Sequence, residues 1–311
     1  MARFESKIIG IDLGTTNTLV SYYDEIAKRG ECCASREGGN LTPSAVFFEN
    51  ADSYIVGRDA KDAAILYPDR TALYFKRLMG ETKEAIDVGG TLYSPQQLSA
   101  FVLKKVVEDA NAELEEEIKD VIITVPAYFS SAAKQATKEA GIIAGLNVRD
   151  IIDEPCAALY HIDSINNLSG KTVMIFDLGG GTLDLIAAEI KDNEINEIAI
   201  GGDTRLGGND WDKMLQQYIR NRYLDGRTLR PDDEQDFGND VEYAKIALTG
   251  KVESRLILRD DVVKIPLKIT RTEFEICTKP LLKKTKKTVQ MFIRFLVGRG
   301  WVYSLSCGRF E

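Results

Sequence analysis

The sequence has little histidine, few cysteines and no long hydrophobic run. His161 is the only histidine among 311 residues, which argues against a histidine-based catalytic triad and against a zinc site with several histidines. The five cysteines show no Cys-x-x-Cys spacing, and an odd number does not fit a disulfide framework, so we expect a cytoplasmic protein. No run of about eighteen apolar residues occurs, and the first residues lack a signal-peptide hydrophobic region, so we expect no membrane span.

The overall charge narrows the range of partners. A formal net charge of −8 argues against nucleic acid or an anionic membrane as the main partner. The length is sufficient for two lobes with buried cores. Only the last stretch, Lys279–Glu311, is basic, with eight Lys or Arg against one acid.

The most informative stretch is Val173–Asp184, which reads Val-Met-Ile-Phe-Asp-Leu-Gly-Gly-Gly-Thr-Leu-Asp. Its apolar residues predict a buried strand that ends at Asp177, and a second apolar strand, Leu185–Ile190, follows. The three glycines permit a tight turn that brings backbone N–H groups close to an anion. An aspartate beside such a turn suits a hydrated Mg²⁺ bound to phosphate. The alternative is a glycine-rich hairpin without a ligand.

The same pattern occurs near the N-terminus. Lys7–Val20 contains an apolar strand, Asp12, Leu13, a glycine turn and two threonines, followed by another apolar run. Two Asp-Leu-Gly hairpins form an internal repeat, which predicts two similar lobes facing each other across a cleft. The pair favours a nucleoside triphosphate held from both sides.

Hydrophobic periodicity and capping signals predict the remaining elements. We expect strands at Lys7–Asp12, Leu19–Tyr23, Ser44–Phe48, Val121–Val125, Val148–Asp153 and Ile195–Ile200. We expect helices at Pro95–Ile118, from Ser130 or Ser131 to Gly145, and at Cys156–Ile162, Trp211–Tyr223, Asp240–Leu248 and Pro280–Ile293. Arg227–Asn239 is predicted to be a charged loop, and Arg294–Glu311, which has no clear period, a final strand and a loose tail.

The polar break Asn166–Gly170 predicts the boundary between the lobes. Lobe I would span residues 1–168, with an inner part (1–39 and 112–168) and an outer part (40–111). Lobe II would span residues 169–311, with an inner part (169–205 and 280–311) and an outer part (206–279).

Two further motifs, Val125-Pro126-Ala127-Tyr128-Phe129 and Asp153-Glu154-Pro155, together with both hairpins carry a family resemblance. Over about residues 7–293 the chain resembles the ATPase domain of the seventy-kilodalton heat-shock chaperones, the DnaK-type family within the actin-like superfamily. The resemblance implies an α/β fold of two actin-like lobes, built on ribonuclease H-like repeats. It also implies ATP or ADP and Mg²⁺ as cofactors.

The resemblance assigns roles to residues at matching positions. It implies a hydrated Mg²⁺ held by Asp12 and Asp177, and catalytic roles for Lys76, Glu154, Thr182 and Asp184. The nucleotide contacts it implies are Gly14, Thr15, Thr16, Asn17, Gly179, Gly180, Gly181, Gly207, Gly208, Glu242, Lys245 and Thr249. It implies that Pro126 and Lys134 couple nucleotide state to other domains. The residues alone leave two alternatives open, namely that Lys76 is an ordinary surface lysine and Glu154 a simple helix-start acid.

The chain departs from the family pattern at three places. Lys134 replaces an arginine, which keeps the charge but loses the planar donor fork. Ile246 replaces the arginine that usually lies against the adenine. The family's Val-Gly-Gly-Ser-x-Arg segment, closing helix, linker and peptide-binding domain do not occur, so we expect a C-terminally incomplete domain, with a frameshift or truncation as the hypothesis.

The leading interpretation is an ATP-binding and slowly ATP-hydrolysing chaperone module. The alternatives are a degenerate nucleotide-binding remnant and an actin-like assembly protein, with a sugar kinase disfavoured by the two further motifs. The resemblance implies a J-domain co-chaperone, a nucleotide exchange factor and unfolded client peptides as partners, and we expect a monomer.

Overall fold

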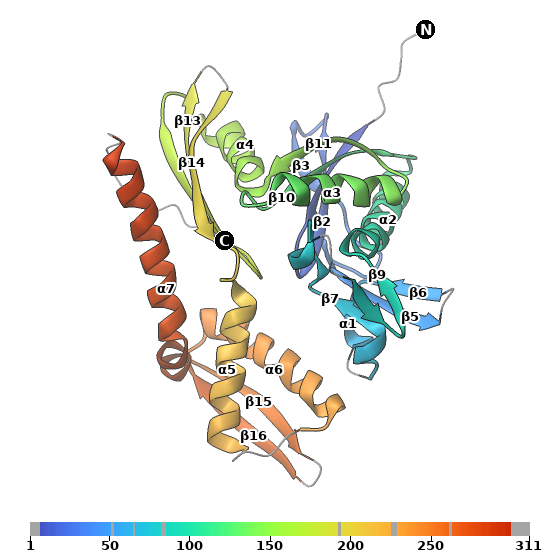
Figure 1. Ribbon diagram of the computed structural model, residues 1–311, viewed down its shortest axis with the longest axis vertical. Coiled ribbons are helices and arrows are strands. Elements are labelled where there is room, and N and C mark those ends of the chain that lie inside the picture. Colours follow the sequence, from blue (N-terminus) through green and yellow to red (C-terminus); the bar gives the residue numbers. More distant parts are fainter. Residues whose placement is uncertain are drawn as a thin grey trace.

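Both Asp-Leu-Gly stretches form antiparallel hairpins in the computed structural model (Figure 1). The first joins β1 (Ile8–Leu13) to β2 (Asn17–Asp24), and the second joins β12 (Thr172–Leu178) to β13 (Leu183–Lys191). The structure describes residues 7–50, 53–64, 66–81, 85–191, 194–224, 229–260 and 263–299. The predicted repeat is therefore a repeat of structure.

The first hairpin lies in a sheet of order β11-β10-β1-β2-β3, with β4 (Leu41–Pro43) also paired to β2. Parallel strands β10 (Asp120–Val125) and β11 (Asn147–Asp153) extend it on one side, and β3 (Arg29–Cys32) ends it on the other. Helices α2 (Pro95–Leu114) and α3 (Ser131–Ile143) contribute to the same hydrophobic core as β1 and β10. The alternation of apolar residues along β1 buries one face of this strand completely.

Smaller elements extend this half of the molecule beyond the sheet (Figure 1). They comprise two short sheets, a short helix and two 3₁₀ turns: β5 (Ala45–Asn50), β6 (Ser53–Val56), α1 (Arg58–Ala63), η1 (Pro68–Arg70), β7 (Thr71–Leu73), η2 (Phe75–Leu78), β8 (Ile86–Val88) and β9 (Thr91–Tyr93). The turn η2 matters most here because it carries Lys76.

The second hairpin lies in a sheet of order β12-β13-β14, where β14 is Glu194–Asp203. Helix α4 (Glu154–Asn166) connects the two sheets and contacts strands of both. The long helix α7 (Arg271–Gly298) runs along β14 and α5 (Gly208–Tyr223), as Figure 1 shows. A separate core joins α5, α6 (Pro231–Gly250), β15 (Glu253–Asp260) and β16 (Val263–Thr270).

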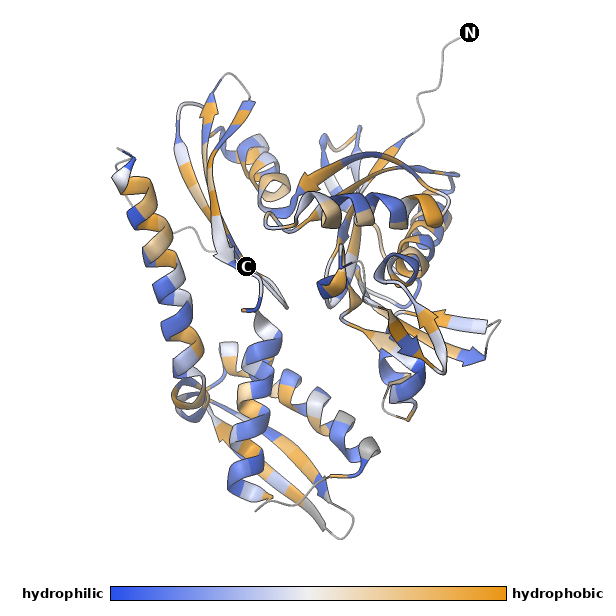
Figure 2. Cartoon of the chain, in the orientation of Figure 1, coloured by the Kyte–Doolittle hydropathy of each residue, from blue (hydrophilic) through white to orange (hydrophobic). Residues whose placement is uncertain are grey.

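Figure 2 shows that apolar residues alternate along the strands and gather on the inward faces of the helices. The prediction of an α/β fold is confirmed. None of the helices within the described ranges combines the length and the apolar composition needed to cross a bilayer.

The predicted charged loop at Arg227–Asn239 is wrong from Pro231 onward, where α6 begins, while residues 227–228 lie outside the described residues. Proline fits the first helical position, and the acids that follow it suit the positive end of the helix dipole. Phe237, Val241 and Ala244 are buried at helical spacing, which anchors this first part of α6. The acidic composition concealed that periodicity.

The last helix is also longer than predicted. It begins at Arg271, where Thr270 and Glu273 form a capping box, and it runs through Pro280. Pro280 lies on the exposed side of the helix, where the hydrogen bond that a proline cannot donate is lost without burying a side chain of the core. The helix then continues through Arg294 to Gly298, so the prediction of irregular structure from Arg294 is wrong for these residues, while residues 300–311 lie outside the described residues.

The other predicted elements differ from the structure mainly at their ends. Helix α2 ends at Leu114 because Glu115 adopts a left-handed conformation with φ 52°, four residues before the predicted end. Helix α3 is capped by Ser130, and Gly145 follows its end with φ 80°, as predicted. The short strands β3, β7, β8 and β9 and the two eight-residue strands β15 and β16 had no counterpart among the predicted elements.

Candidate functional site

Three glycine-containing loops meet where the two hairpins face each other. A Cβ atom on Gly180 would lie 2.6 Å from Thr16 Oγ1, and one on Gly181 would lie 3.3 Å from Thr15 Oγ1. A Cβ on Gly207 would lie 2.5 Å from the backbone nitrogen of Gly181. The loops therefore pack so closely that Gly207 admits no side chain without backbone movement, and a side chain on Gly180 would displace the Thr16 hydroxyl.

Backbone hydrogen bonds fix the loop before α5 against the second hairpin. The nitrogen of Gly208 donates to Gly179 O at 2.9 Å, and that of Asn209 donates to Gly180 O at 2.9 Å. The hydroxyl of Thr16 is buried and has no hydrogen-bond partner in the part of the chain that the structure describes. A buried donor without a partner is costly, which points to a polar ligand at this position.

Lys76 is buried beside these loops. It is 3% exposed, and its Nζ lies 2.6 Å from Glu154 Oε1 and 5.7 Å from the centre of the Phe129 ring. The alternative of an ordinary surface lysine is therefore wrong. Glu154 is the first residue of α4, but its ion pair gives it a contact that a simple helix-start acid does not have.

Burial raises the pKa of Glu154 to about 7, although the charge of Lys76 lowers it. The charges of Asp12 and Asp184 raise this pKa further. Glu154 thus belongs to a group of carboxylates that share one buried lysine.

Three aspartates at the ends of the hairpin strands complete this group. Asp12 accepts a hydrogen bond from Thr124 Oγ1 at 3.0 Å, and Asp184 accepts one from the backbone nitrogen of Ala127 at 3.1 Å. Burial raises the pKa of Asp184, and hydrogen bonds from Thr182 and Ala127 oppose this effect. Burial also raises the pKa of Asp177, and the charges of Asp184 and Asp12 add to it.

These carboxylates fit a hydrated Mg²⁺ and not a metal held by protein ligands alone. In the described ranges no three His, Cys, Asp or Glu side chains form a metal-binding cluster. Mg²⁺ keeps several waters and usually needs only one or two carboxylates together with substrate phosphate. Burial and, to a lesser extent, repulsion by Asp184 and Asp12 raise the pKa of Asp177, and a nearby cation would relieve that repulsion.

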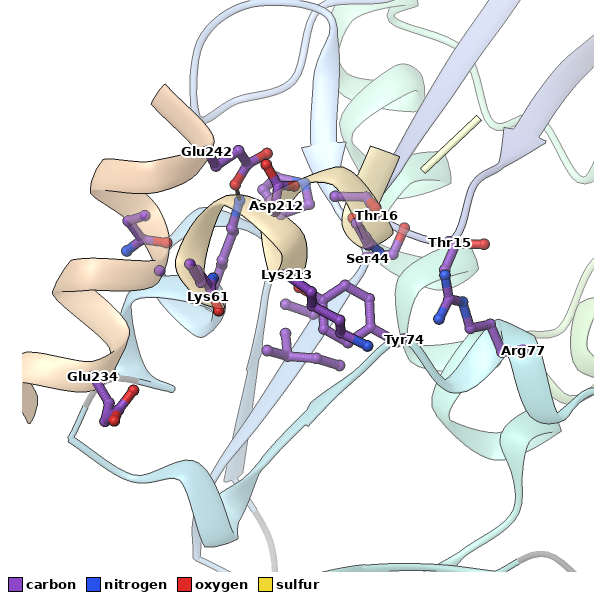
Figure 3. Close-up of a pocket in the computed structure, with 17 residues that line it drawn as sticks. Thr15, Thr16, Ser44, Lys61, Tyr74, Arg77, Asp212, Lys213, Glu234 and Glu242 are labelled. Carbon is purple, nitrogen blue, oxygen red and sulfur yellow. Dashed lines mark hydrogen bonds and ion pairs between the residues drawn. The ribbon is translucent and has the colours of Figure 1, made fainter. Parts of the chain in front are cut away.

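The three predicted contacts on α6 lie in different surroundings. Glu242 lines a cavity of about 290 Å³ that also reaches Thr15 and Thr16, and its carboxylate pairs with Lys61 Nζ of α1 at 3.1 Å (Figure 3). Lys245 and Thr249 instead line a neighbouring cavity of about 550 Å³. The structure therefore does not bring all three into one cavity.

The larger cavity is apolar with a few polar groups. Ile246 and Trp211 line it together with Gly208 of the glycine loop and Arg271 at the start of α7. An apolar wall beside a loop that can bind phosphate is a suitable arrangement for a heterocyclic base. The departure at Ile246 thus lies at this wall.

Two charged residues of the site were not predicted from the sequence. Arg77 Nη2 donates to Gly181 O at 3.4 Å, and its guanidinium lies against the second hairpin. Asp212 is buried and binds Lys245 Nζ at 2.7 Å, and burial raises its pKa although Lys245 lowers it. Adjacency to Lys76 was an available signal for Arg77, whereas nothing in the sequence joins Asp212 to a lysine on another helix.

The predicted coupling residues lie next to the site. Pro126 follows β10 directly, and the backbone of the next residue, Ala127, donates to Asp184. Lys134 Nζ lies 2.6 Å from Asp153 Oδ1, immediately before Glu154. Pro126 is therefore the chain neighbour of a residue that binds Asp184, and Lys134 pairs with the residue before Glu154.

Comparisons with known proteins give a consistent result. The family model described as "Hsp70 protein" matches residues 8–294. The chain is 39% identical over 303 residues to the chaperone protein DnaK of Thermotoga neapolitana and 37% identical over 300 residues to that of Thermosipho melanesiensis. Each match covers 93% of this chain and 50% of the relative, so the chain spans about half the length of the curated relatives it matches.

Proposed function

The chain belongs to the Hsp70 family, and from this premise we propose that it binds and hydrolyses ATP as the nucleotide-binding module of a DnaK-type chaperone. Its mixed α/β architecture is consistent with the actin-like ATPase domain of that family. The observation that carries the proposal is the meeting of two Asp-Leu-Gly hairpins around the buried Lys76–Glu154 pair.

The glycine loops would bind the phosphates. The backbone N–H groups of Gly180 and Gly181 would donate to the phosphates, because those of Gly14 and Gly179 already donate to Asp12 O and Thr182 O within their own turns. The Thr16 hydroxyl, which has no partner among the described residues, offers a further donor. Thr15, Asn17, Thr182, Gly207 and Gly208 border the same place, and Arg77 adds positive charge. Since phosphoryl transfer requires positioning and charge neutralisation, fixed donors of this kind account for most of the expected rate increase.

Asp12 and Asp177 would hold a hydrated Mg²⁺, whose charge would offset that of the phosphates. Lys76 supplies a fixed positive charge that needs no reorganisation, because it is already held by Glu154. Glu154 would accept a proton from the attacking water, and a pKa of about 7 suits a general base at neutral pH. Asp184 would orient that water from a position fixed by the Ala127 backbone.

The nucleoside would lie in the larger cavity. Ile246 and Trp211 provide apolar surface for the base, and Lys245 and Thr249 provide donors for the sugar. Because Glu242 lines the other cavity and is paired with Lys61, we propose that it contributes indirectly, by fixing α6 against α1.

We extend the proposal to the biology of the family. A J-domain co-chaperone, an exchange factor and unfolded clients would be the partners of the whole protein, with Pro126 and Lys134 relaying nucleotide state. The two-lobe division at residues 168 and 169 and a monomeric state are part of the same proposal. A cytoplasmic setting is supported by Cys32, Cys33, Cys156 and Cys277, which are free thiols.

Calorimetric titration of the purified chain with ATP tests the proposal, in the presence and absence of Mg²⁺. We expect micromolar or tighter affinity, about −8 kcal/mol or better, with Mg²⁺. Asp177→Asn should abolish the Mg²⁺-dependent part of the affinity, whereas the exposed Asp150→Asn should not. A folded chain that binds no ATP would instead support the degenerate-remnant interpretation, and ATP-dependent filaments would support the assembly protein.

Turnover separates binding from catalysis. Lys76→Ala should leave ATP affinity within a few-fold of the original and lower the hydrolysis rate by about 100-fold or more, as expected for loss of a positioned charge. Equal turnover in this variant would remove Lys76 from the catalytic group.

A further inference from the structure

The turns of the two hairpins are anchored by different parts of the chain. In the second hairpin, the carbonyls of Gly179 and Gly180 accept hydrogen bonds from backbone nitrogens at the start of α5, each at 2.9 Å. In the first hairpin, Ser44 binds the carbonyls of Gly14 and Thr16. Ser44 lies between β4 and β5, outside both hairpins. Each turn therefore has carbonyl groups that are held from outside.

Ser44 binds the first turn through two separate donors. Its backbone nitrogen donates to Thr16 O at 2.8 Å, and its hydroxyl donates to Gly14 O at 2.8 Å. The two accepting carbonyls lie on either side of Thr15 in the sequence, so one residue holds both ends of the turn. Ser44 is 3% exposed, and hydrogen bonds shielded from water in this way are stronger than exposed ones.

A second buried hydroxyl fixes the direction of the Ser44 hydroxyl. Thr18 Oγ1 lies 2.9 Å from Ser44 Oγ, and Thr18 is completely buried. Because Ser44 has one hydroxyl proton and donates it to Gly14 O, Thr18 is the donor in this contact. The pairing of β4 with β2 holds Thr18 in place, since Thr18 lies opposite Thr42 in that ladder. The two hydroxyls thus form a short chain that ends at the turn.

A hydrogen bond that holds a carbonyl also orients an N–H group. Gly14 O and the N–H of Thr15 belong to one peptide group, and in a planar trans peptide the two point in opposite directions. The Ser44 hydroxyl therefore directs the Thr15 N–H away from itself. The bond to Thr16 O does the same for the N–H of Asn17. Within the described ranges the Thr15 nitrogen donates no hydrogen bond, so it is free to bind an anion.

We propose that Ser44 is a positioning residue, which orients the backbone donors of the first turn toward the phosphates of the bound nucleotide. This inference rests on the proposed function. Ser44 acts through the Gly14–Thr15 peptide, and Thr18 acts through Ser44. Donors that are fixed before the nucleotide binds need no reorganisation, which is the property that phosphate binding and phosphoryl transfer require.

Binding of ATP and of adenosine, which carries no phosphate, tests this role. In Ser44→Ala the affinity for Mg-ATP should fall about tenfold, while the affinity for adenosine stays as in the original chain. The matched control is Ser99→Ala, which removes the completely buried hydroxyl of Ser99 on α2, in contact with Met79 Sδ. Its ratio of ATP to adenosine affinity should not change. A general loss of stability would weaken both ligands, so the ratio separates positioning from a merely structural role.

A double-substitution cycle tests the path from Thr18 through Ser44. Thr18→Val removes the hydroxyl that directs Ser44 and keeps the side-chain shape, so it should lower the ratio of ATP to adenosine affinity about threefold. In a chain that already carries Ser44→Ala, Thr18→Val should lower this ratio no further, because the group through which it acts is absent. Independent, additive effects of the two substitutions would contradict the path.

Hydrogen exchange without nucleotide tests the anchor separately from the proposed function. Relative to intrinsic rates, the amides of Gly14 and of residue 44 should exchange about tenfold faster in Ser44→Ala and at the original rate in Ser99→Ala. The amides of β1 and β10 serve as an internal reference for global unfolding. Unchanged exchange at the turn, or an unchanged affinity ratio in Ser44→Ala, would overturn the inference. A chain that bound no ATP would refute the proposed function instead, and the exchange rates would still show whether Ser44 holds the turn.

Discussion

The Lys76–Glu154 pair allows a quantitative test of the buried charge group. Lys76→Met removes the cation and keeps most of the side-chain volume, so Glu154 is left beside Asp12 and Asp184 without its counter-charge. A buried carboxylate in that position either stays ionised at a cost of about 3–5 kcal/mol or takes up a proton. Protonation of Glu154 limits the loss in free energy of unfolding, and it makes the effect of the substitution depend on pH.

The sign follows from the proton balance. Burial raises the pKa of Glu154 from 4.5 to about 7, so between these values the folded protein holds a proton that the unfolded chain has lost, and stability falls as pH rises. In the original protein this loss ends above about pH 7, where the ion pair forms. In Lys76→Met the pKa is higher, so the loss continues, and each further pH unit costs about 1.4 kcal/mol.

Urea unfolding followed by circular dichroism measures the difference between the two proteins. We expect Lys76→Met to be within about 1 kcal/mol of the original protein at pH 6 and about 2 kcal/mol less stable at pH 8.5. The double variant Lys76→Met/Glu154→Gln has no carboxylate at position 154 to titrate and should differ from the original by an amount that no longer grows above pH 7. An equal effect of Lys76→Met at both pH values would refute this account of the pair.

Two further substitutions test the loops and the start of α6. Gly207→Ala places a Cβ 2.5 Å from the Gly181 nitrogen and should weaken ATP binding about tenfold or more in calorimetry. Gly208→Ala, whose Cβ meets no atom closer than 3.5 Å, should bind ATP nearly as before. Similar ATP affinities of the two variants would contradict the tight loop packing. Phe237→Ala should lower the free energy of unfolding by about 3–5 kcal/mol, because Phe237 is 1% exposed. Tyr243→Ala, on the same helix but 70% exposed, should lower it by less than about 1 kcal/mol. Equal losses would show that α6 is not anchored through Phe237.

Local signals were sufficient where the chemistry of neighbouring residues decides the structure. The glycine turns after Asp12 and Asp177 could be predicted because glycine readily permits tight turns, and the repeat itself indicated that two hairpins face each other. The cap at Ser130 and the stop at Gly145 are likewise local. At α6 the same approach failed, because acids that stabilise a helix start also resemble a charged loop.

Long-range packing decided the features of the site that no local pattern could predict. No local pattern shows that Lys76 is buried or that it meets a glutamate 78 residues later, since both facts depend on how η2 and α4 come together. The separation of Glu242 from Lys245 and Thr249 also depends on the two cavities that border α6. Sequence by itself determined which residues could bind phosphate and metal, because residue type and turn chemistry are local properties. Only the tertiary structure decided which of them share a buried environment, because burial and charge proximity arise when distant segments pack.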